Sequence, residues 1–372
     1  MPPPAPSPST CFLVADDLTG ACDAAVHFAA RGLRVSVPLS PSAPPETAVL
    51  AVSTESRALT PPQIRARIRD AARIPSTRPR ILFKKIDSTL RGLPGVEIAA
   101  ALDAFACAAA LVCPAFPALH RIVRDGRLAV ATAPDFPAID VAAHLRAQGL
   151  HAALLRAPAD LADAVASGAR AIVLDAATDA DLDRIAAAGL ALGAPLLWAG
   201  SGGLAAALAR TLAPAAHSLP VPAPSPGPAL LIIGSDHPVT LAQQQALASA
   251  RRVEILDAAS AAPESVRNAL TGPRPVLLRV PWGRVSASQL RASLDGAPAR
   301  PLLLSGGDTA SLFCRAAQVE RIDLIAEIVP GIPRSLLRGG LCDGLSAATK
   351  SGGFGEPDAL IQVVDYFSCQ KP

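Results

Sequence analysis

Short apolar segments alternate with helical ones along this chain of 372 residues, and this alternation most constrains its fold. In the first third of the chain the predicted strands and helices follow one another over residues 11–15, 21–31, 33–38, 47–52, 61–74, 80–83, 96–106 and 108–113. The alternation continues to residue 212 and resumes at residue 229. Such a pattern is typical of a mainly parallel sheet covered by helices on both faces, so we predict an α/β fold.

The length of the chain predicts two domains, because 372 residues exceed what one ordinary hydrophobic core accommodates. Residues 213–227 (APAAHSLPVPAPSPG) are rich in proline and form the predicted linker between a domain over 11–212 and one over 228–372. We expect each domain to be a mainly parallel sheet flanked by helices. Residues 1–10 lack the basic start and apolar run of a signal peptide, and we predict that they are a disordered Pro-rich tail.

Composition excludes several classes of function. Hydrophobic residues make up 51% of the chain and charged residues 17%, which describes a well-buried globular protein. The net charge of +3 comes without a basic stripe interleaved with aromatic residues, so we expect no nucleic-acid partner. No apolar run reaches membrane-spanning length, and the seven cysteines form no C-x-x-C pair. We therefore expect a cytoplasmic protein with free thiols and no membrane partner.

A dense polar cluster follows the strand predicted to end at Phe83. The segment LFKKIDSTLRG (residues 82–92) holds three cations, a carboxylate and two hydroxyls: Lys84, Lys85, Arg91, Asp87, Ser88 and Thr89. The cations are suited to binding an anion, Asp87 to accepting a proton, and the hydroxyls to hydrogen-bonding a substrate hydroxyl or a phosphate. The alternative is a solvated turn in which Asp87 is the N-cap of a helix.

Two further polar pairs follow predicted strands. Asp16 and Asp17 come directly after the first strand, and Ser56 and Arg57 follow the strand over residues 47–52. Ligands of parallel sheets bind at the carboxyl ends of the strands, so we expect these residues to join the cluster of residues 82–92 in one site. Adjacent carboxylates there are able to bind substrate hydroxyls, hold Mg²⁺ or act as a base. The alternative is one N-cap beside one exposed acid.

The second half of the chain has three glycine-rich turns: GSDHPVT (234–240), SGGDT (305–309) and KSGGFG (350–355). Glycine lets backbone N–H groups approach phosphate oxygens at a helix N-terminus, so the three turns predict a nucleotide site. Its predicted residues are Ser235, His237, Gly306, Gly307, Asp308, Thr309, Lys350, Gly352, Gly353 and Gly355. Each turn alone reads as an ordinary tight turn. The chain has neither a P-loop motif nor the dinucleotide-binding motif, and its histidines show no metal-ligand spacing.

Taken together, these segments resemble the four-carbon acid sugar kinase family. Nine segments occur in the family's order and span nearly the whole chain: VADDLTGACDAA (14–25), TESR (54–57), KKIDSTLRG (84–92), PAFP (114–117), GSGGLA (200–205), GSxxPVTxAQ (234–243), GGDTA (306–310), PGIP (330–333) and KSGGFG (350–355). The chain departs from the family pattern in being shorter. It also departs at Leu119-His120-Arg121, where the family has Gly-Arg, and at His237, where many members have serine.

The resemblance implies an N-terminal domain that binds a tetronate-type acid sugar and a C-terminal domain that binds ATP, with the active site in the cleft between them. It implies transfer of the γ-phosphoryl group of ATP to threonate, erythronate or 3-oxo-tetronate, giving the 4-phosphate. Mg²⁺ is expected with the triphosphate, while its protein ligands are left undetermined. Closure about residues 213–227 is a further hypothesis.

The implied roles of the first-domain residues follow from their chemistry. Arg57 and Arg91, with Lys84 or Lys85, would clamp the substrate carboxylate or the transferring phosphate. The substrate hydroxyls would lie against Asp16, Asp17 and the neighbouring hydroxyl residues Ser56, Ser88 and Thr89. Either Asp87 or Asp17 would orient or deprotonate the attacking hydroxyl, and the sequence leaves this choice open. It also leaves open homo-oligomerisation.

Two rival functions remain at this point. One is another sugar-acid enzyme, such as an aldolase or isomerase, that uses the basic cluster without ATP. The other is a non-catalytic ligand-binding protein of the same fold.

Overall fold

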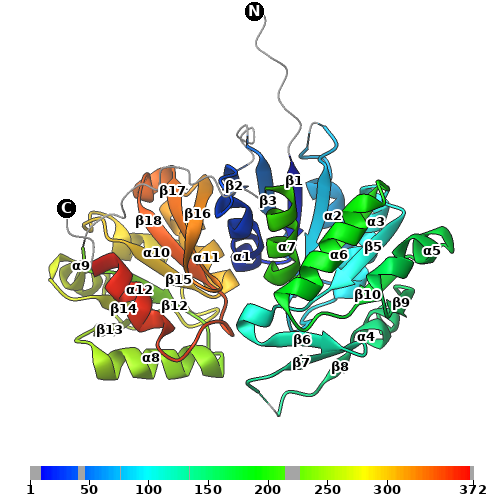
Figure 1. The fold of residues 1–372 in the computed structure, drawn as a ribbon. Helices are drawn as coiled ribbons and strands as arrows, with labels where there is room; N and C mark the ends of the chain where they lie inside the picture. The colour runs from blue at the N-terminus through cyan, green and yellow to red at the C-terminus, as the bar shows by residue number, and fades with distance from the viewer. Residues whose placement is uncertain (1–9, 41–46, 76, 134, 214–226, 369–372) are drawn as a thin grey trace, which may run out of the picture. The chain divides into compact units, whose positions relative to one another are not determined.

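The computed structural model describes residues 10–40, 47–75, 77–133, 135–213 and 227–368, and the chain divides into two compact units. Unit 1 contains residues 1–35 and 44–217, and unit 2 contains residues 36–43 and 218–372. The Pro-rich tail, apart from Thr10, and the predicted linker, apart from its two end residues, lie outside the described residues. The predicted α/β class is confirmed in both units (Figure 1).

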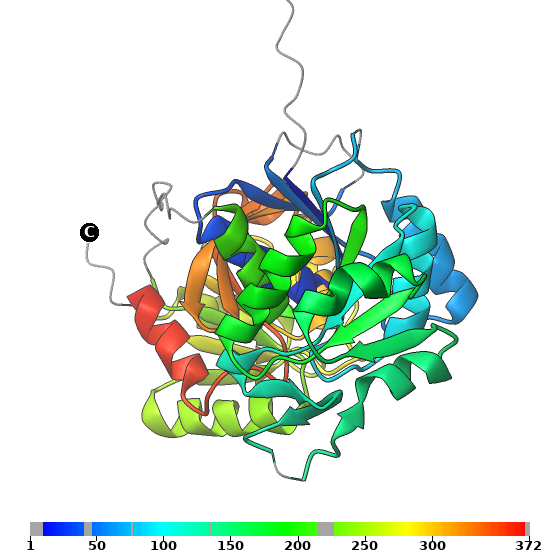
Figure 2. The same cartoon turned by 45° about the vertical axis from the view of Figure 1, so that its right-hand side comes forward.

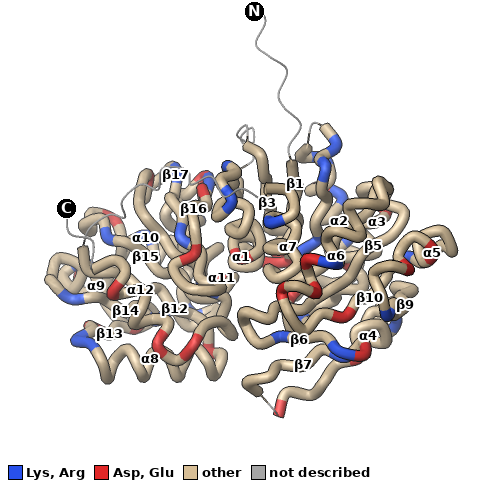
Figure 3. Tube along the Cα trace, viewed as in Figure 1, with Lys and Arg blue, Asp and Glu red and all other residues tan. Residues whose placement is uncertain are grey.

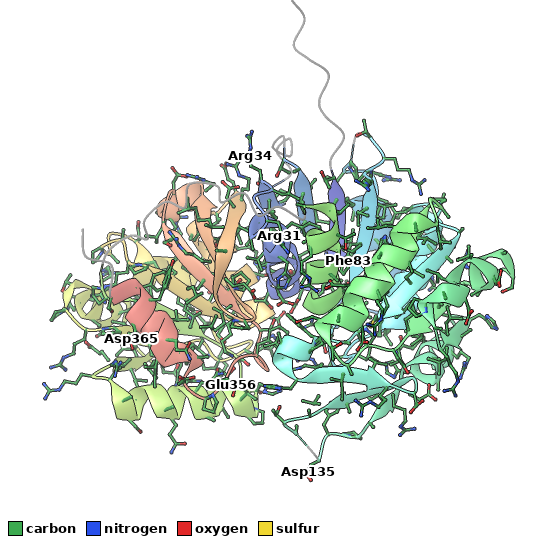
Figure 4. The ribbon with its side chains drawn as sticks, in the orientation of Figure 1. Arg31, Arg34, Phe83, Asp135, Glu356 and Asp365 are labelled. Atoms are coloured by element: carbon green, nitrogen blue, oxygen red, sulfur yellow. The ribbon has the colours of Figure 1, made fainter. Side chains whose placement is uncertain are left out.

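Unit 1 is built on a parallel sheet with the strand order β3-β1-β4-β11-β5-β10-β9. Its strands are β1 (Cys11–Ala15), β3 (Val49–Ser53), β4 (Ile81–Lys85), β5 (Ala109–Cys113), β9 (Ala152–Leu155), β10 (Ala171–Leu174) and β11 (Leu196–Gly200). Most of these strands are buried throughout, as expected where helices cover both faces of a parallel sheet. Phe83 on β4 lies in this interior (Figure 4).

The helices of unit 1 form two packed groups. Helices α1 (Leu18–Ala29), α7 (Gly202–Leu212) and α6 (Asp179–Ala191) pack side by side, and so do α2 (Pro61–Ala71), α3 (Pro94–Ala104) and α4 (Val141–Ala147). The first group lies in front of the sheet in Figure 1, and the turned view in Figure 2 separates it from α2 and α3. The short helix α5 (Leu161–Ala166) connects β9 to β10.

Two sequence predictions in unit 1 are wrong. The strand predicted to end at Phe83 continues through Lys84 and Lys85, because β4 pairs with β1 on one side and β11 on the other up to Lys85. The segment predicted as a loop over residues 114–125 contains the strand β6 (Arg121–Arg124). This strand pairs with β7 (Arg127–Val130), which in turn pairs with β8 (Ile139–Asp140) to form a small antiparallel sheet.

Unit 2 combines parallel and antiparallel pairing. The strands β13 (Glu254–Asp257), β14 (Val276–Arg279), β12 (Leu230–Ile233), β15 (Leu302–Ser305) and β18 (Ser346–Lys350) are parallel in this spatial order. Antiparallel strands β17 (Ile332–Arg338) and β16 (Arg321–Val329) follow beside β18. Part of β2 (Val35–Pro38) belongs to this unit, where Ser36 Oγ donates to Asp323 Oδ1 at 2.9 Å.

The helices of unit 2 cover its parallel strands. Apolar side chains of α8 (Pro238–Ala250) and α12 (Ala359–Ser368) pack with those of β12, β14 and β15 in one buried core. Arg251, the C-cap of α8, forms an ion pair at 2.6 Å with Asp365 on α12, which Figure 4 labels. Helix α10 (Ala287–Leu294) packs between α9 (Pro263–Thr271) and α11 (Gly307–Ala317).

Charged residues are sparse along the chain, as Figure 3 shows, so those that lie inside a unit stand out. Buried charged side chains include Asp16, Asp17, Asp23, Lys84, Lys85, Asp87 and Glu97 in unit 1, and Arg300, Arg334 and Lys350 in unit 2. Among the described residues no helix is both long and apolar enough to cross a membrane.

Candidate functional site

Arg57 lies among three carboxylates at the carboxyl ends of the strands of unit 1. Its Nε donates to Asp16 Oδ2 at 2.6 Å, and its Nη1 lies 2.7 Å from Asp17 Oδ2. Its Nη2 lies 3.7 Å from Asp87 Oδ1. The topology explains this meeting, because β1 lies between β3 and β4, and the residues that follow these strands share one sheet edge.

The two adjacent aspartates have different surroundings. Asp17 is the N-cap of α1: its Oδ1 accepts from Gly20 N at 2.7 Å, and Thr19 Oγ1 donates to its Oδ2 at 3.2 Å. A Cβ at Gly20 would lie 2.5 Å from Asp17 Oδ1, so a larger residue there would force the capping carboxylate to move. Asp16 is 2% exposed, and its Oδ1 has no hydrogen-bond partner among the described residues.

Asp87 uses both of its oxygens. Its Oδ2 accepts from Thr89 N at 3.1 Å, Thr89 Oγ1 at 2.6 Å and Arg91 Nε at 3.0 Å. Its Oδ1 accepts from Arg91 Nη2 at 2.6 Å, which completes a bidentate pair with that guanidinium. The arrangement fixes the turn after β4 and holds Arg91, whose side chain remains 50% exposed, beside the carboxylates.

The cations keep two of these carboxylates ionised. Burial by itself would raise the pKa of Asp87, but the hydrogen bond and charge of Arg91 lower it well below its usual range. Burial likewise opposes ionisation of Asp16, and the charges of Arg57 and Lys84 lower its pKa. Both groups therefore carry negative charge at neutral pH.

Lys84 and Glu97 form a buried ion pair beneath this cluster. Lys84 is 0% exposed, and its Nζ lies 2.9 Å from Glu97 Oε2 and donates to the carbonyl of Lys85 at 2.9 Å. Ser56 Oγ donates to Glu97 Oε1 at 2.6 Å. Burial raises the pKa of Glu97. Glu97, in the first turn of α3, thus contacts β4 through Lys84 and the segment after β3 through Ser56.

Three charged residues join the cluster in addition to the predicted site residues. Besides Glu97, Asp23 on α1 lies 3.8 Å from Lys85 Nζ, which also donates to the carbonyl of Ile86 at 3.1 Å. Arg121 on β6 interacts electrostatically with Asp87 and Asp23. Burial lowers the pKa of Arg121 overall, although these two acidic charges act to raise it. Asp23 lies within the VADDLTGACDAA segment, and Glu97 is the first acid after residues 82–92, so position in the sequence was an available signal for both.

Unit 1 thus brings together the residues predicted for the acid-sugar site. Asp16, Asp17, Arg57, Asp87 and Arg91 are linked by direct ion pairs. The other predicted members lie around them: Ser56 and Lys84 contact Glu97, Lys85 lies near Asp23, Thr89 contacts Asp87, and Ser88 is buried.

In unit 2 the three glycine-rich turns meet at the carboxyl ends of β12, β15 and β18. A Cβ at Gly234 would lie 2.2 Å from Thr309 Oγ1, and a Cβ at Gly352 would lie 2.2 Å from Ser235 Oγ. Gly306 has φ +103° as the N-cap of α11, a conformation that favours glycine. We call these turns, residues 234–240, 305–309 and 350–355, the glycine cradle.

The helix α8 holds the last turn of the cradle in place. Thr240 Oγ1 donates to the carbonyl of Gly352 at 2.6 Å. Gln243 Nε2 donates to the carbonyls of Phe354, Gly355 and Glu356 at 3.0, 2.9 and 2.9 Å. His237, the N-cap of α8, accepts at Nδ1 from Val239 N at 3.2 Å, and its ring lies 3.1 Å from where a Cβ of Gly353 would be.

Lys350 points into the protein. It is 0% exposed, and its Nζ donates to Thr240 Oγ1 at 3.0 Å and to the carbonyls of Ser351 and Gly352 at 3.1 and 3.2 Å. Burial lowers its pKa to about 7. The side chain therefore organises the backbone of the cradle, whereas Asp308, at the start of α11, is exposed.

The cradle has polar groups to offer a ligand. Ser305 Oγ in the cradle and Thr349 Oγ1, just before it on β18, are buried and have no hydrogen-bond partner among the described residues. Two helices, α8 and α11, begin at the cradle and direct backbone N–H groups toward it. Over the same described residues, no group of three or more His, Cys, Asp or Glu side chains is placed to hold a metal ion.

Comparison with protein families identifies both units. A family described as a sugar-binding N-terminal domain matches residues 11–208, and one described as a nucleotide-binding C-terminal domain matches residues 283–360. The chain is 35% identical to the D-threonate kinase of Bordetella bronchiseptica, over 94% of this chain and 95% of the relative. It is 28% identical to the D-erythronate kinase of Heliobacterium modesticaldum, over 96% of this chain and 97% of that relative. It is 30% identical to the 3-oxo-tetronate kinase of Methylobacterium radiotolerans, over 95% of this chain and 98% of that relative.

A solved structure shares the fold. A protein of Salmonella typhimurium superposes with a TM-score of 0.77 at 20% identity, covering 97% of this chain and 100% of that one.

Proposed function

This chain belongs to the four-carbon acid sugar kinase family, and we propose that it transfers the γ-phosphoryl group of ATP to threonate, erythronate or 3-oxo-tetronate, giving the 4-phosphate. The relatives named for these three substrates match nearly the whole chain, which supports a kinase acting on a four-carbon sugar acid. In this proposal unit 1 binds the sugar acid and unit 2 binds ATP.

The observation that carries the proposal is the arrangement around Arg57. A guanidinium that pairs with two carboxylates, beside a buried carboxylate oxygen without a partner, suits a ligand with both an anionic end and hydroxyl groups. Unpaired buried oxygens are costly, so Asp16 Oδ1 gains from a hydroxyl donor. A polyhydroxy acid supplies both kinds of group.

The cations divide into ligand-binding and structural ones. Arg91 and Arg57 have side chains that are 50% and 27% exposed, so their guanidinium groups are the ones that would bind the substrate carboxylate. Lys84 is fully buried against Glu97 and would act by positioning the end of β4. Lys85 is also buried, with its ammonium near Asp23 and Gly20.

The geometry favours Asp16 as the carboxylate that receives the substrate hydroxyl. Both oxygens of Asp87 are already hydrogen-bonded, and its lowered pKa makes it a weak proton acceptor. Asp17 is committed to capping α1 and to Arg57. Asp16 Oδ1 remains available to orient the hydroxyl. This task suffices, because phosphoryl transfer depends mainly on positioning and charge stabilisation.

The glycine cradle would hold the triphosphate. Its backbone N–H groups and the hydroxyl of Ser305 suit phosphate oxygens, and the close approach at Gly234 and Gly352 leaves the loops without bulky side chains. Mg²⁺ would arrive with ATP and neutralise the phosphate charge. The described residues of this chain supply no three-ligand cluster for it.

The experiment is to incubate the protein with ATP, Mg²⁺ and each of the tetronates while following ADP release. We expect at least one tetronate to stimulate ADP release and to yield a product phosphorylated at its terminal hydroxyl, identified by NMR. Absence of stimulation by every tetronate contradicts the kinase proposal and favours a sugar-acid enzyme that does not use ATP, or a binding protein. Asp16→Asn tests the hydroxyl assignment, with Asp87→Asn as the matched comparison: Asp16→Asn should lower kcat more.

A further inference from the structure

Trp282 is the most exposed large hydrophobic side chain in the part of the chain that the structure describes. Its exposed fraction is 78%, whereas the next, Leu241, is 52% exposed. Aromatic residues make up only 3% of the chain, and its other tryptophan, Trp198, is buried on β11. An indole exposed to water lacks the favourable free energy that burial of its large apolar surface would provide. Ligand binding is one way to recover that gain.

A fixed turn presents this side chain. Arg284 N donates to the carbonyl of Pro281 at 3.1 Å, and Gly283 has φ +70°, as in a type II turn with Trp282 at its second position. Val280 and Val285 flank the turn and are 2% and 7% exposed. The backbone that carries the indole is therefore anchored at both ends, which reduces the entropy that a contact with a ligand would cost.

This turn begins at the backbone of the glycine cradle. The strand β14 lies beside β12, and Val280 N, just after β14, donates to the carbonyl of Ile233 at 2.9 Å. A Cβ at Gly234 would lie 2.6 Å from the carbonyl oxygen of Val280. Trp282 is two residues further along, so it rises from the same sheet edge as the cradle, next to its first turn.

We propose that Trp282 stacks on the purine base of a nucleotide whose phosphates lie on the glycine cradle, an inference that rests on the proposed kinase function. The cradle offers backbone and hydroxyl groups, which suit phosphates but not the flat apolar face of a base. An aromatic ring beside a phosphate site supplies that face, and stacking of this kind accepts any purine. Trp282 would thus contribute affinity for the base and leave the choice between adenine and guanine to other groups.

The test compares ATP with inorganic tripolyphosphate, which has the phosphates but no base. Affinities for both probes are measured by calorimetry on the full chain and on Trp282→Ala, Trp282→Phe and Leu341→Ala. Leu341 is the matched control. It is 42% exposed, but it precedes β18 and so lies at the amino-terminal end of that strand, away from the cradle. Base–aromatic stacking is strong enough that Trp282→Ala should weaken ATP binding about tenfold. Tripolyphosphate affinity should not change.

We expect Trp282→Phe to recover most of the ATP affinity and Leu341→Ala to match the unchanged protein. Equal ATP affinity in Trp282→Ala and the unchanged protein overturns the stacking proposal alone, as does an equal loss for ATP and tripolyphosphate. If the unchanged protein binds no ATP and no tetronate stimulates ADP release, the proposed function fails as well. Steady-state kinetics give a second readout, because loss of stacking should raise the KM for ATP and not the KM for the tetronate.

Discussion

The sites of the two units use different chemistry. In unit 1 the site consists of charged side chains that neutralise one another, with Arg57 bridging three carboxylates and Lys84 paired with Glu97. In unit 2 the glycine cradle is built from backbone segments that approach closely and are held by hydrogen bonds from Thr240, Gln243 and Lys350. The first site should therefore fail when a charge is lost, and the second when volume is added.

Loss of the Arg57 charge should have the largest effect. Arg57→Ala leaves Asp16 and Asp17 buried without their partner, and removing one member of a buried ion pair costs about 3–5 kcal/mol. We expect loss of tetronate-stimulated ADP release and a lower unfolding midpoint in urea. Arg57→Lys, which keeps the charge but not the two-pronged contact, should recover stability more than activity. An Arg57→Ala enzyme with normal kcat/KM for the tetronate would contradict the proposed site.

Loss of the Glu97 charge should act on stability first. Glu97→Gln leaves the ammonium of Lys84 in a fully buried position without an acid, which should lower the free energy of unfolding by about 3 kcal/mol. The double variant Lys84→Met/Glu97→Gln should regain much of this loss, since neither position of the pair then holds a buried charge without its partner. Urea denaturation of the two variants measures the difference. Equal stability of the single and double variants would show that the pair is not coupled.

Added volume should damage the glycine cradle without a change of charge. Gly352→Ala places a methyl group 2.2 Å from Ser235 Oγ, so the Ser235 side chain must move, and we expect ATP affinity to fall about tenfold. Gly353→Ala is the milder change in the same turn, because its methyl group would approach the His237 ring no closer than 3.1 Å at Nε2. Tetronate affinity should be unchanged in both variants. Identical ATP affinities for the two would argue against close approach as the basis of the cradle.

The smallest expected effect is a pH dependence from Lys350. Its pKa is about 7 in the folded protein and about 10.5 when unfolded, so between these values the unfolded chain binds the extra proton. Stability therefore rises with pH in this window, and the rise is complete only near pH 10.5. Relative to Lys350→Met, the free energy of unfolding should increase by about 1 kcal/mol from pH 7.5 to 8.5. Parallel urea titrations of both proteins over that range check it, and a constant difference would contradict the assignment.

Much of the fold was readable in the sequence because it depends on local patterns. Cys11–Ala15 is a strand with the predicted bounds, and the strand predicted over 108–113 is found at Ala109–Cys113, since a run of buried apolar residues marks a central parallel strand. The hairpin of β6 and β7 was missed, although Asp125-Gly126 is a strong hairpin signal. Both residues have positive φ, and their N–H groups donate to Asp175 at 2.6 and 2.8 Å, a partner fifty positions away.

The sequence by itself determined the α/β class and the strand ends at which polar residues gather, because periodicity and turn residues act over short distances. Only the tertiary structure decided what each polar residue does. Lys84 and Arg91 belong to one predicted cluster, yet pairing of β4 with β1 and β11 buries Lys84 on Glu97 while Arg91 stays half exposed. The roles of buried charges depend on distant partners and on desolvation, and neither is encoded within a short stretch of sequence.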